Sequence, residues 1–154
     1  MFVEKKLCVL TKKGRCDIAD TGYNWDAAWS VIDAAIALTQ GGTIFDESAE
    51  IDLDGKAACL ISFDTDYSNH AKATAGLSIS ILRDVDDTVY ESVNGAAVSF
   101  EMPFTQAGTE RKTIFLSAQQ FQKFIIRQDW GNTTGSAVAT TATAIKYATI
   151  PAAS

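Results

Sequence analysis

From residue 47 onward, apolar side chains recur at every second position, segment after segment. In one clear case Leu77, Ile79 and Ile81 alternate with Ser78 and Ser80. A period of two is typical of strands that bury one face and expose the other. Clusters of Gly, Asn and Asp separate the segments, and such clusters are typical of turns. The same alternation is found at residues 49–53, 58–63, 98–102 and 114–116.

Two later segments complete the series. Residues 121–127 are apolar on both faces, which predicts a central strand, and "SAVATTATAIKYATI" at 136–150 predicts one long final strand. We expect the edges of this flat Ala/Thr-rich strand to be hidden by oligomerisation or docking. No repeat or linker divides the 154 residues, so we expect one domain over residues 1–154. The predicted fold is all-β, a single antiparallel β-sandwich of the jelly-roll-like kind.

The segment before residue 40 fits two structures. Trp25, Trp29, Ile32 and Ile36 fall at helical spacing, which predicts a short helix near residues 25–38. Trp29 to Ala35 also reads as a strand, and the all-β context favours that alternative. We favour the strand and keep the helix open.

The N-terminal residues 1–16 alternate charged and apolar side chains, which predicts a hairpin or an arm that reaches a partner. Cys8 and Cys16 would lie at the ends of such a hairpin. Cys59 lies in the apolar run "AACLISF", as a buried thiol would. An odd number of cysteines, a single histidine and no CxxC argue against a disulfide framework or a zinc site, and favour folding in a reducing cytoplasm.

The charge balance limits the partners. The net charge is −6 and the pI is about 4.6, whereas nucleic-acid-binding proteins carry a basic patch. No stretch has the 18 or more apolar residues of a transmembrane helix, and the N-terminus lacks the apolar core of a signal peptide. We therefore expect neither a nucleic-acid nor a membrane partner.

The acidic stretch "RDVDD" is the first candidate site. Asp84, Asp86 and Asp87 are clustered carboxylates of the type that calcium binds. Asp also favours turns, because its side chain bonds to its own backbone, and Arg83 would partly neutralise the cluster. We favour a turn, keep calcium as the alternative ligand, and expect no other cofactor.

Catalytic chemistry has little support in the sequence. A serine or cysteine triad needs a histidine base, and His70 lies in the polar loop "DYSNHAKAT" with no GxSxG motif in the chain. Paired carboxylates could cleave a glycosidic bond, but acidic loops do not define the spacing that this reaction needs. The prediction is that the protein is not an enzyme, and a small glycan hydrolase is the weakest of the alternatives.

Aromatic side chains offer a second candidate site. Trp130, Tyr90 and Tyr67 could form a platform for a glycan, as in jelly-roll carbohydrate-binding modules. Trp130 stands in the turn "DWGNTTG", where an indole either binds a ligand or folds back over the end of the sandwich. We favour the second interpretation.

The order of elements resembles small β-sandwich virion proteins of tailed bacteriophages, of the capsid decoration or cement type. The likeness covers roughly residues 25–150, from "WSVIDAAIALTQGGTIFDESAEIDLDGK" to "AIKYATIP". The matching turn signatures are Arg83-Asp84 with Asp87, the strand residue Tyr90, and Asn132 with Gly135. "RDVDDT" lacks the glycine of the family's turn, and the first 24 residues have no counterpart.

The resemblance implies a structural protein with no catalytic residues. Such a protein is made in the host cytoplasm, is located in the virion, and braces the shell as a homo-oligomer. Its partners would be the major capsid protein or other virion proteins. The alternative function is a carbohydrate-binding jelly-roll module that attaches a virion to host glycans.

Overall fold

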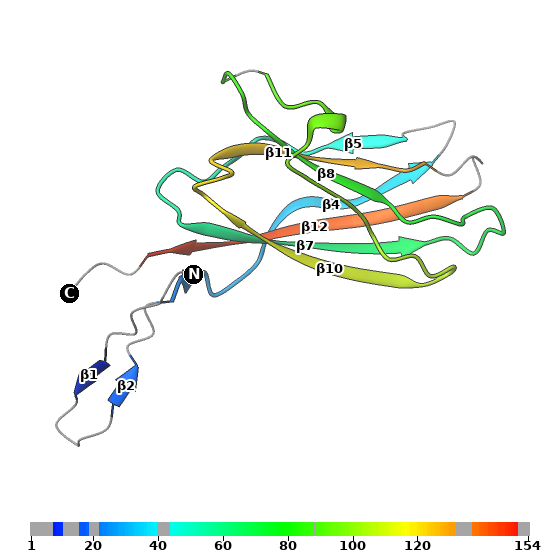
Figure 1. Cartoon of the computed structure of the whole chain (residues 1–154). Coiled ribbons are helices and arrows are strands. Elements are labelled where there is room, and N and C mark those ends of the chain that lie inside the picture. The colour runs from blue at the N-terminus through cyan, green and yellow to red at the C-terminus, as the bar shows by residue number, and fades with distance from the viewer. Residues whose placement is uncertain are drawn as a thin grey trace.

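In the computed structural model, the longest strand lies in the middle of the larger of two facing sheets (Figure 1). The structure describes residues 8–10, 16–18, 22–39, 44–87, 89–131 and 137–150. The central strand β12 (Val138–Thr149) pairs antiparallel with β7 (Ala58–Tyr67) on one side and with β4 (Ser30–Thr39) on the other. β10 (Thr109–Ser117) continues the sheet beyond β7, and the short β3 (Asn24–Trp25) pairs with the end of β12.

The second sheet is built around β11 (Lys123–Asp129). β8 (Ser78–Arg83) pairs with one side of it, and β5 (Phe45–Glu47) and β6 (Ile51–Asp52) pair with the other. β9 (Val98–Glu101) pairs with β8 and is the edge strand on that side of the sheet. A single turn of 3₁₀-helix, η1 (Val93–Gly95), precedes β9 in the chain. Every strand pair is antiparallel, so the predicted all-β antiparallel sandwich is confirmed.

The alternative of a helix near residues 25–38 is wrong, because β3 and β4 occupy this segment. Two register shifts in the β4–β12 ladder, between Thr141 and Ala144, each place one extra residue on β4. Such bulges interrupt the strict alternation of a strand. Ile32 and Ile36 both pack against the core, because residues four apart lie on one face of a strand as well as of a helix, so their spacing fits both structures.

The final strand differs from the prediction in one respect. β12 is long and rich in small residues, as expected, but both of its edges are paired within the chain, to β7 and to β4. The expectation that oligomerisation hides these edges is therefore wrong for β12. The open edges of the larger sheet belong to β10 and β4 instead.

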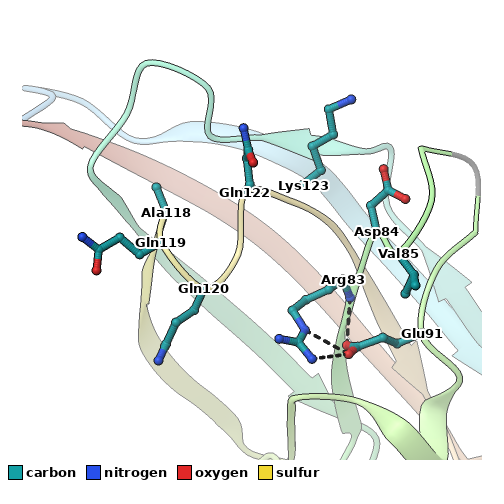
Figure 2. A pocket seen from close by; sticks show the side chains of 9 residues that line it. All are labelled: Arg83, Asp84, Val85, Glu91, Ala118, Gln119, Gln120, Gln122 and Lys123. Carbon is teal, nitrogen blue, oxygen red and sulfur yellow. Dashed lines mark hydrogen bonds and ion pairs between the residues drawn. The ribbon is translucent and has the colours of Figure 1, made fainter.

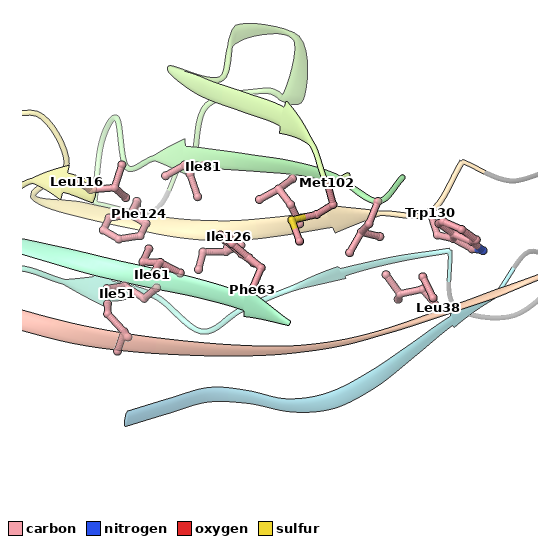
Figure 3. Close-up of a cluster of buried hydrophobic side chains, with 14 of the residues drawn as sticks. Leu38, Ile51, Ile61, Phe63, Ile81, Met102, Leu116, Phe124, Ile126 and Trp130 are labelled. Atoms are coloured by element: carbon pink, nitrogen blue, oxygen red, sulfur yellow. The ribbon is translucent and has the colours of Figure 1, made fainter. Parts of the chain in front are cut away.

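The core fills the space between the two sheets (Figure 3). Ile61 and Phe63 of β7 point toward Phe124 and Ile126 of β11, and all four side chains are fully buried. Cys59 is buried among them, as predicted, and burial raises the pKa of its thiol to about 12. The alternation read from the sequence thus produces the inward face of each sheet.

At the N-terminus, β1 (Cys8–Leu10) and β2 (Cys16–Ile18) form a two-stranded antiparallel sheet that lies apart from the sandwich (Figure 1). This is in line with the hairpin alternative for residues 1–16, whose other residues lie outside the described part of the chain. In the ladder Cys8 is opposite Ile18 and Cys16 is opposite Leu10, so the two cysteines are not ladder partners.

Candidate functional site

The acidic stretch after β8 forms a turn held by its own polar groups. Asp84 forms an isolated antiparallel bridge with Tyr90, and its Oδ1 accepts a hydrogen bond from the backbone N–H of Asp86 at 3.1 Å. Asp87 has a φ of 55°, in the left-handed region that Asp tolerates better than most residues, and its Oδ1 lies 3.2 Å from Lys123 Nζ. These contacts are those of a reversing turn.

The metal alternative gains no additional ligand from the fold. Among the side chains that the structure describes, no group of three or more His, Cys, Asp or Glu is placed to hold a metal ion, and Asp84, Asp86 and Asp87 form no such group.

A polar pocket of about 370 Å³ lies beside this turn (Figure 2). Gln119, Gln120 and Gln122 line it from the loop between β10 and β11. Across the pocket, the Arg83 guanidinium donates to Glu91 Oε1 from Nε (2.9 Å) and Nη2 (2.5 Å), and this pairing lowers the pKa of Glu91. Amides and a fixed ion pair offer both hydrogen-bond donors and acceptors to a small polar ligand.

Two members of the predicted glycan platform are core residues. Trp130 is 2% exposed, its Nε1 donates to the Ala137 carbonyl at 3.0 Å, and its ring stacks on Tyr67. Tyr67 is also buried, and its hydroxyl accepts a hydrogen bond from the Leu77 backbone N–H. Trp130 thus folds back over the end of the sandwich, and neither ring presents a face on which a sugar could stack.

Tyr90 lies elsewhere, beside the acidic turn. Its hydroxyl donates to Glu50 Oε2 at 2.6 Å, and this hydrogen bond to a carboxylate raises the pKa of the phenol to about 12. The structure therefore does not bring Tyr90, Tyr67 and Trp130 together on one surface. His70 lies in the loop after β7, where its Nδ1 accepts a hydrogen bond from the Lys72 backbone N–H at 3.1 Å.

A groove with a largely apolar lining lies on the outer face of the larger sheet, and we call it the outer groove. It measures about 610 Å³ and is lined from β4 and the residues before it, from β7, from β10 and from β12. Trp29 and Val31 lie at one side, 42% and 74% exposed, and Asp64 forms an ion pair with Arg111 at the other. Ala142 and Ala144 give it a shallow floor with small side chains.

An aromatic cluster lies on the same sheet. The Tyr23 ring is 5.7 Å from the rings of both Trp25 and Phe115, and Phe115 is 48% exposed. Sequence reasoning missed Tyr23 and Phe115 as surface candidates. The signal for Phe115 was present, because it alternates with the inward-facing Ile114 and Leu116 and so falls on the outward face of β10.

No protein-family model matches the chain, and no curated protein is significantly similar to it. In the described part of the chain, no helix is long and apolar enough to cross a membrane.

Proposed function

We propose that this protein is a non-enzymatic structural subunit of a tailed-phage virion, a decoration or cement protein that braces the shell as a homo-oligomer. The observation that carries the proposal is the exposed apolar surface on the outer face of the larger sheet. Trp29 and Val31 line the outer groove, and Phe115 belongs to the aromatic cluster on β10. Contiguous exposed apolar side chains on a folded domain mark a surface that a partner covers. The resemblance of the sequence to decoration proteins supplies the virion context.

The occupant that we propose for the outer groove is the N-terminal segment, residues 1–21, of a second copy of this chain. In each copy β1 and β2 form a two-stranded sheet that lies apart from the sandwich (Figure 1). A two-stranded sheet alone in water is marginally stable, so it needs a surface to pack against. The outer groove of a neighbouring subunit provides that surface.

Charge complementarity supports this arrangement. Residues 1–21 hold five of the thirteen Lys and Arg but three of the nineteen Asp and Glu, a net charge of +2. The remaining residues therefore carry a net charge of −8. A basic segment with Phe2, Val3 and Leu7 matches an acidic body with an apolar groove, because opposite potentials steer association and apolar contacts hold it.

Light scattering on the full-length protein tests the assembly. We expect the wild type to have the mass of a closed oligomer, and Val31→Ser to lower that mass, because it removes an exposed apolar contact without touching the core. The matched control is Val85→Ser, since Val85 is 67% exposed but lies on the acidic turn. A monomeric wild type, or dissociation by Val85→Ser in place of Val31→Ser, would overturn the arrangement.

The arm is tested by charge reversal in the same assay. Lys12→Glu with Lys13→Glu should weaken assembly strongly and make it less salt-dependent, whereas Lys72→Glu in the loop after β7 should leave it unchanged. Equal masses for the two variants would argue against the arm.

The virion location needs its own measurement. Mass spectrometry of purified phage particles produced from the genome that encodes this chain should detect it at a fixed ratio to the major capsid protein. Its absence from washed particles would contradict the proposed location while leaving the oligomer intact.

The alternative function, carbohydrate binding, is favoured by the polar pocket of Figure 2 rather than by the aromatic platform. Its amides and its Arg83–Glu91 pair could bind sugar hydroxyls. Calorimetry with a panel of monosaccharides tests this function. Binding that Gln120→Ala removes and that Asn94→Ala, in η1, retains would favour glycan attachment over shell bracing.

A further inference from the structure

Four oxygen-bearing side chains belong to two ladder pairs at the edge where the chain passes from one sheet to the other. Asp33 of β4 is the ladder partner of Thr143 of β12, and Asp46 of β5 is the ladder partner of Gln128 of β11. The Gln128 Nε2 donates to Thr143 Oγ1 at 3.5 Å, which joins the two pairs across the interior of the sandwich. Burial, and after it the neighbouring charge of Asp46, raises the pKa of the Asp33 carboxyl group.

Two oxygen atoms of this cluster are buried hydrogen-bond acceptors that no described residue bonds to. Gln128 is 1% exposed, and its Oε1 is a buried acceptor with no hydrogen-bond partner among the described residues. The same holds for Asp33 Oδ2. A buried acceptor without a donor destabilises the fold, and two in one place are unusual in a native protein. The described residues therefore supply neither a hydrogen-bond donor nor a cation to these two acceptors.

Among the described residues, no cation forms an ion pair with the cluster. None of the ion pairs between described side chains involves Asp33 or Asp46. Arg127 is next to Gln128 in sequence, but its guanidinium binds Asp129 and Glu47, and alternate residues of β11 face opposite sides of the sheet. Burial raises the pKa of both carboxyl groups, as expected for carboxylates without a compensating charge.

We propose that Asp33, Asp46, Gln128 and Thr143 bind a calcium ion that joins the two sheets at this edge. The available ligands are two carboxylates, an amide carbonyl and a hydroxyl, all of them oxygen donors. Calcium takes six to eight such ligands in flexible geometry, with water completing the set, whereas magnesium requires near-ideal octahedral geometry. Softer metals prefer nitrogen or sulfur, which this cluster does not offer.

The site has a route to solvent and a structural role. Asp33 and Asp46 are each partly exposed, whereas Gln128 and Thr143 are buried, so an ion in solution can approach the cluster from the two carboxyl groups. β4 and β5 lie at the edges of their sheets and are consecutive in the chain. An ion held by both would fix this crossover and hold the outer groove's β4 wall in place.

Thermal unfolding of the full-length protein, in chelator and then in excess calcium, tests the site. At about 100 times the dissociation constant we expect calcium to raise the Tm by about 5–10 °C. Asp33→Asn and Asp46→Asn should each abolish the rise, and in chelator each should be at least as stable as the wild type, because it removes an uncompensated charge. Asp87→Asn, in the acidic turn, is the control and should keep the full response.

Two results would overturn the proposal: no change of Tm with calcium, or a response that Asp87→Asn abolishes and Asp46→Asn retains. A second readout needs no variant. Calcium added to the ¹⁵N-labelled protein should shift amide resonances at residues 32–34, 45–47, 128 and 143. Shifts confined to residues 84–87 would place the ion at the turn and contradict this site.

Discussion

The indole of Trp130 stacks on the phenol ring of Tyr67, with the ring centroids 5.7 Å apart and the planes inclined by 26°. The pair closes one end of the sandwich, and each ring also has a polar anchor. Trp130 donates to the Ala137 carbonyl, and Tyr67 accepts from the Leu77 backbone N–H. Both contacts reach across the fold to backbone groups that would otherwise be buried without a partner.

This pair should contribute strongly to stability. Trp130→Ala removes a buried indole, and we expect it to lower the free energy of unfolding by about 3–5 kcal/mol. Trp130→Phe keeps most of the volume but leaves the Ala137 carbonyl without its donor, at a cost of about 1–3 kcal/mol. Urea unfolding measures both. A loss below about 1 kcal/mol for Trp130→Ala, comparable to that of Val85→Ala on the surface, would contradict the packing role.

Gly76 has no room for a side chain, because Met102, the residue after β9, approaches it closely. A Cβ at this position would lie 1.9 Å from the Met102 carbonyl oxygen, so the backbone would have to move. That movement disturbs the hydrogen bond from Met102 N–H to the Leu77 carbonyl, now 2.8 Å long. We expect Gly76→Ala to lower the free energy of unfolding by about 3 kcal/mol. Gly131→Ala, whose Cβ would meet nothing within 4 Å, should change it by less than about 0.5 kcal/mol.

Cys59 should be chemically inert in the folded protein. Its side chain is fully buried, and the raised pKa, about 12, leaves almost no thiolate near neutral pH. In a Cys8→Ser, Cys16→Ser background, a thiol-specific dye at about pH 8 should label no cysteine in the native protein and one in guanidinium chloride. Rapid labelling of the native protein would show that the core opens at β7.

The carboxyl pair at the sheet crossover predicts a pH dependence in the absence of calcium. Asp33 and Asp46 have folded-state pKa values raised above 3.8, by burial first and then by neighbouring carboxylates. A raised pKa gives stability that is fully present below the unfolded-state pKa and is lost as the pH rises through the folded-state pKa. In chelator, the stability of the wild type relative to Asp33→Asn should therefore increase as the pH falls from 7 toward about 4.

Urea unfolding over that pH range measures this difference, and comparison with the variant cancels the contributions of other groups, such as Glu91, whose lowered pKa acts in the opposite direction. A difference that does not vary with pH would mean that Asp33 is solvated in the folded state.

Much of the fold is local and could be predicted from the sequence. The alternation of Leu77, Ile79 and Ile81 predicts β8, because side chains of a strand point to opposite faces whatever the strand pairs with. The turn at Asp84 could likewise be predicted, since its hydrogen bond to Asp86 joins residues that are two positions apart. The candidate surfaces, in contrast, could not be predicted, because they depend on the order of the strands in the sheet. Trp29 and Phe115 lie on one face only because β12 and β7 stand between their strands.

From residue 47 onward, the sequence by itself determined that the chain forms strands, where they turn, and which of their side chains face inward. Tertiary structure alone decided between strand and helix at residues 25–38, through the pairing of β4 with β12. It also decided that Trp130 is buried, and it brought Asp33, Asp46 and Gln128 together from three strands. The physical reason is the separation along the sequence over which each effect acts. Periodicity and turn chemistry act over a few residues, whereas the order of the strands and the packing of one sheet on the other depend on contacts between residues far apart in the chain.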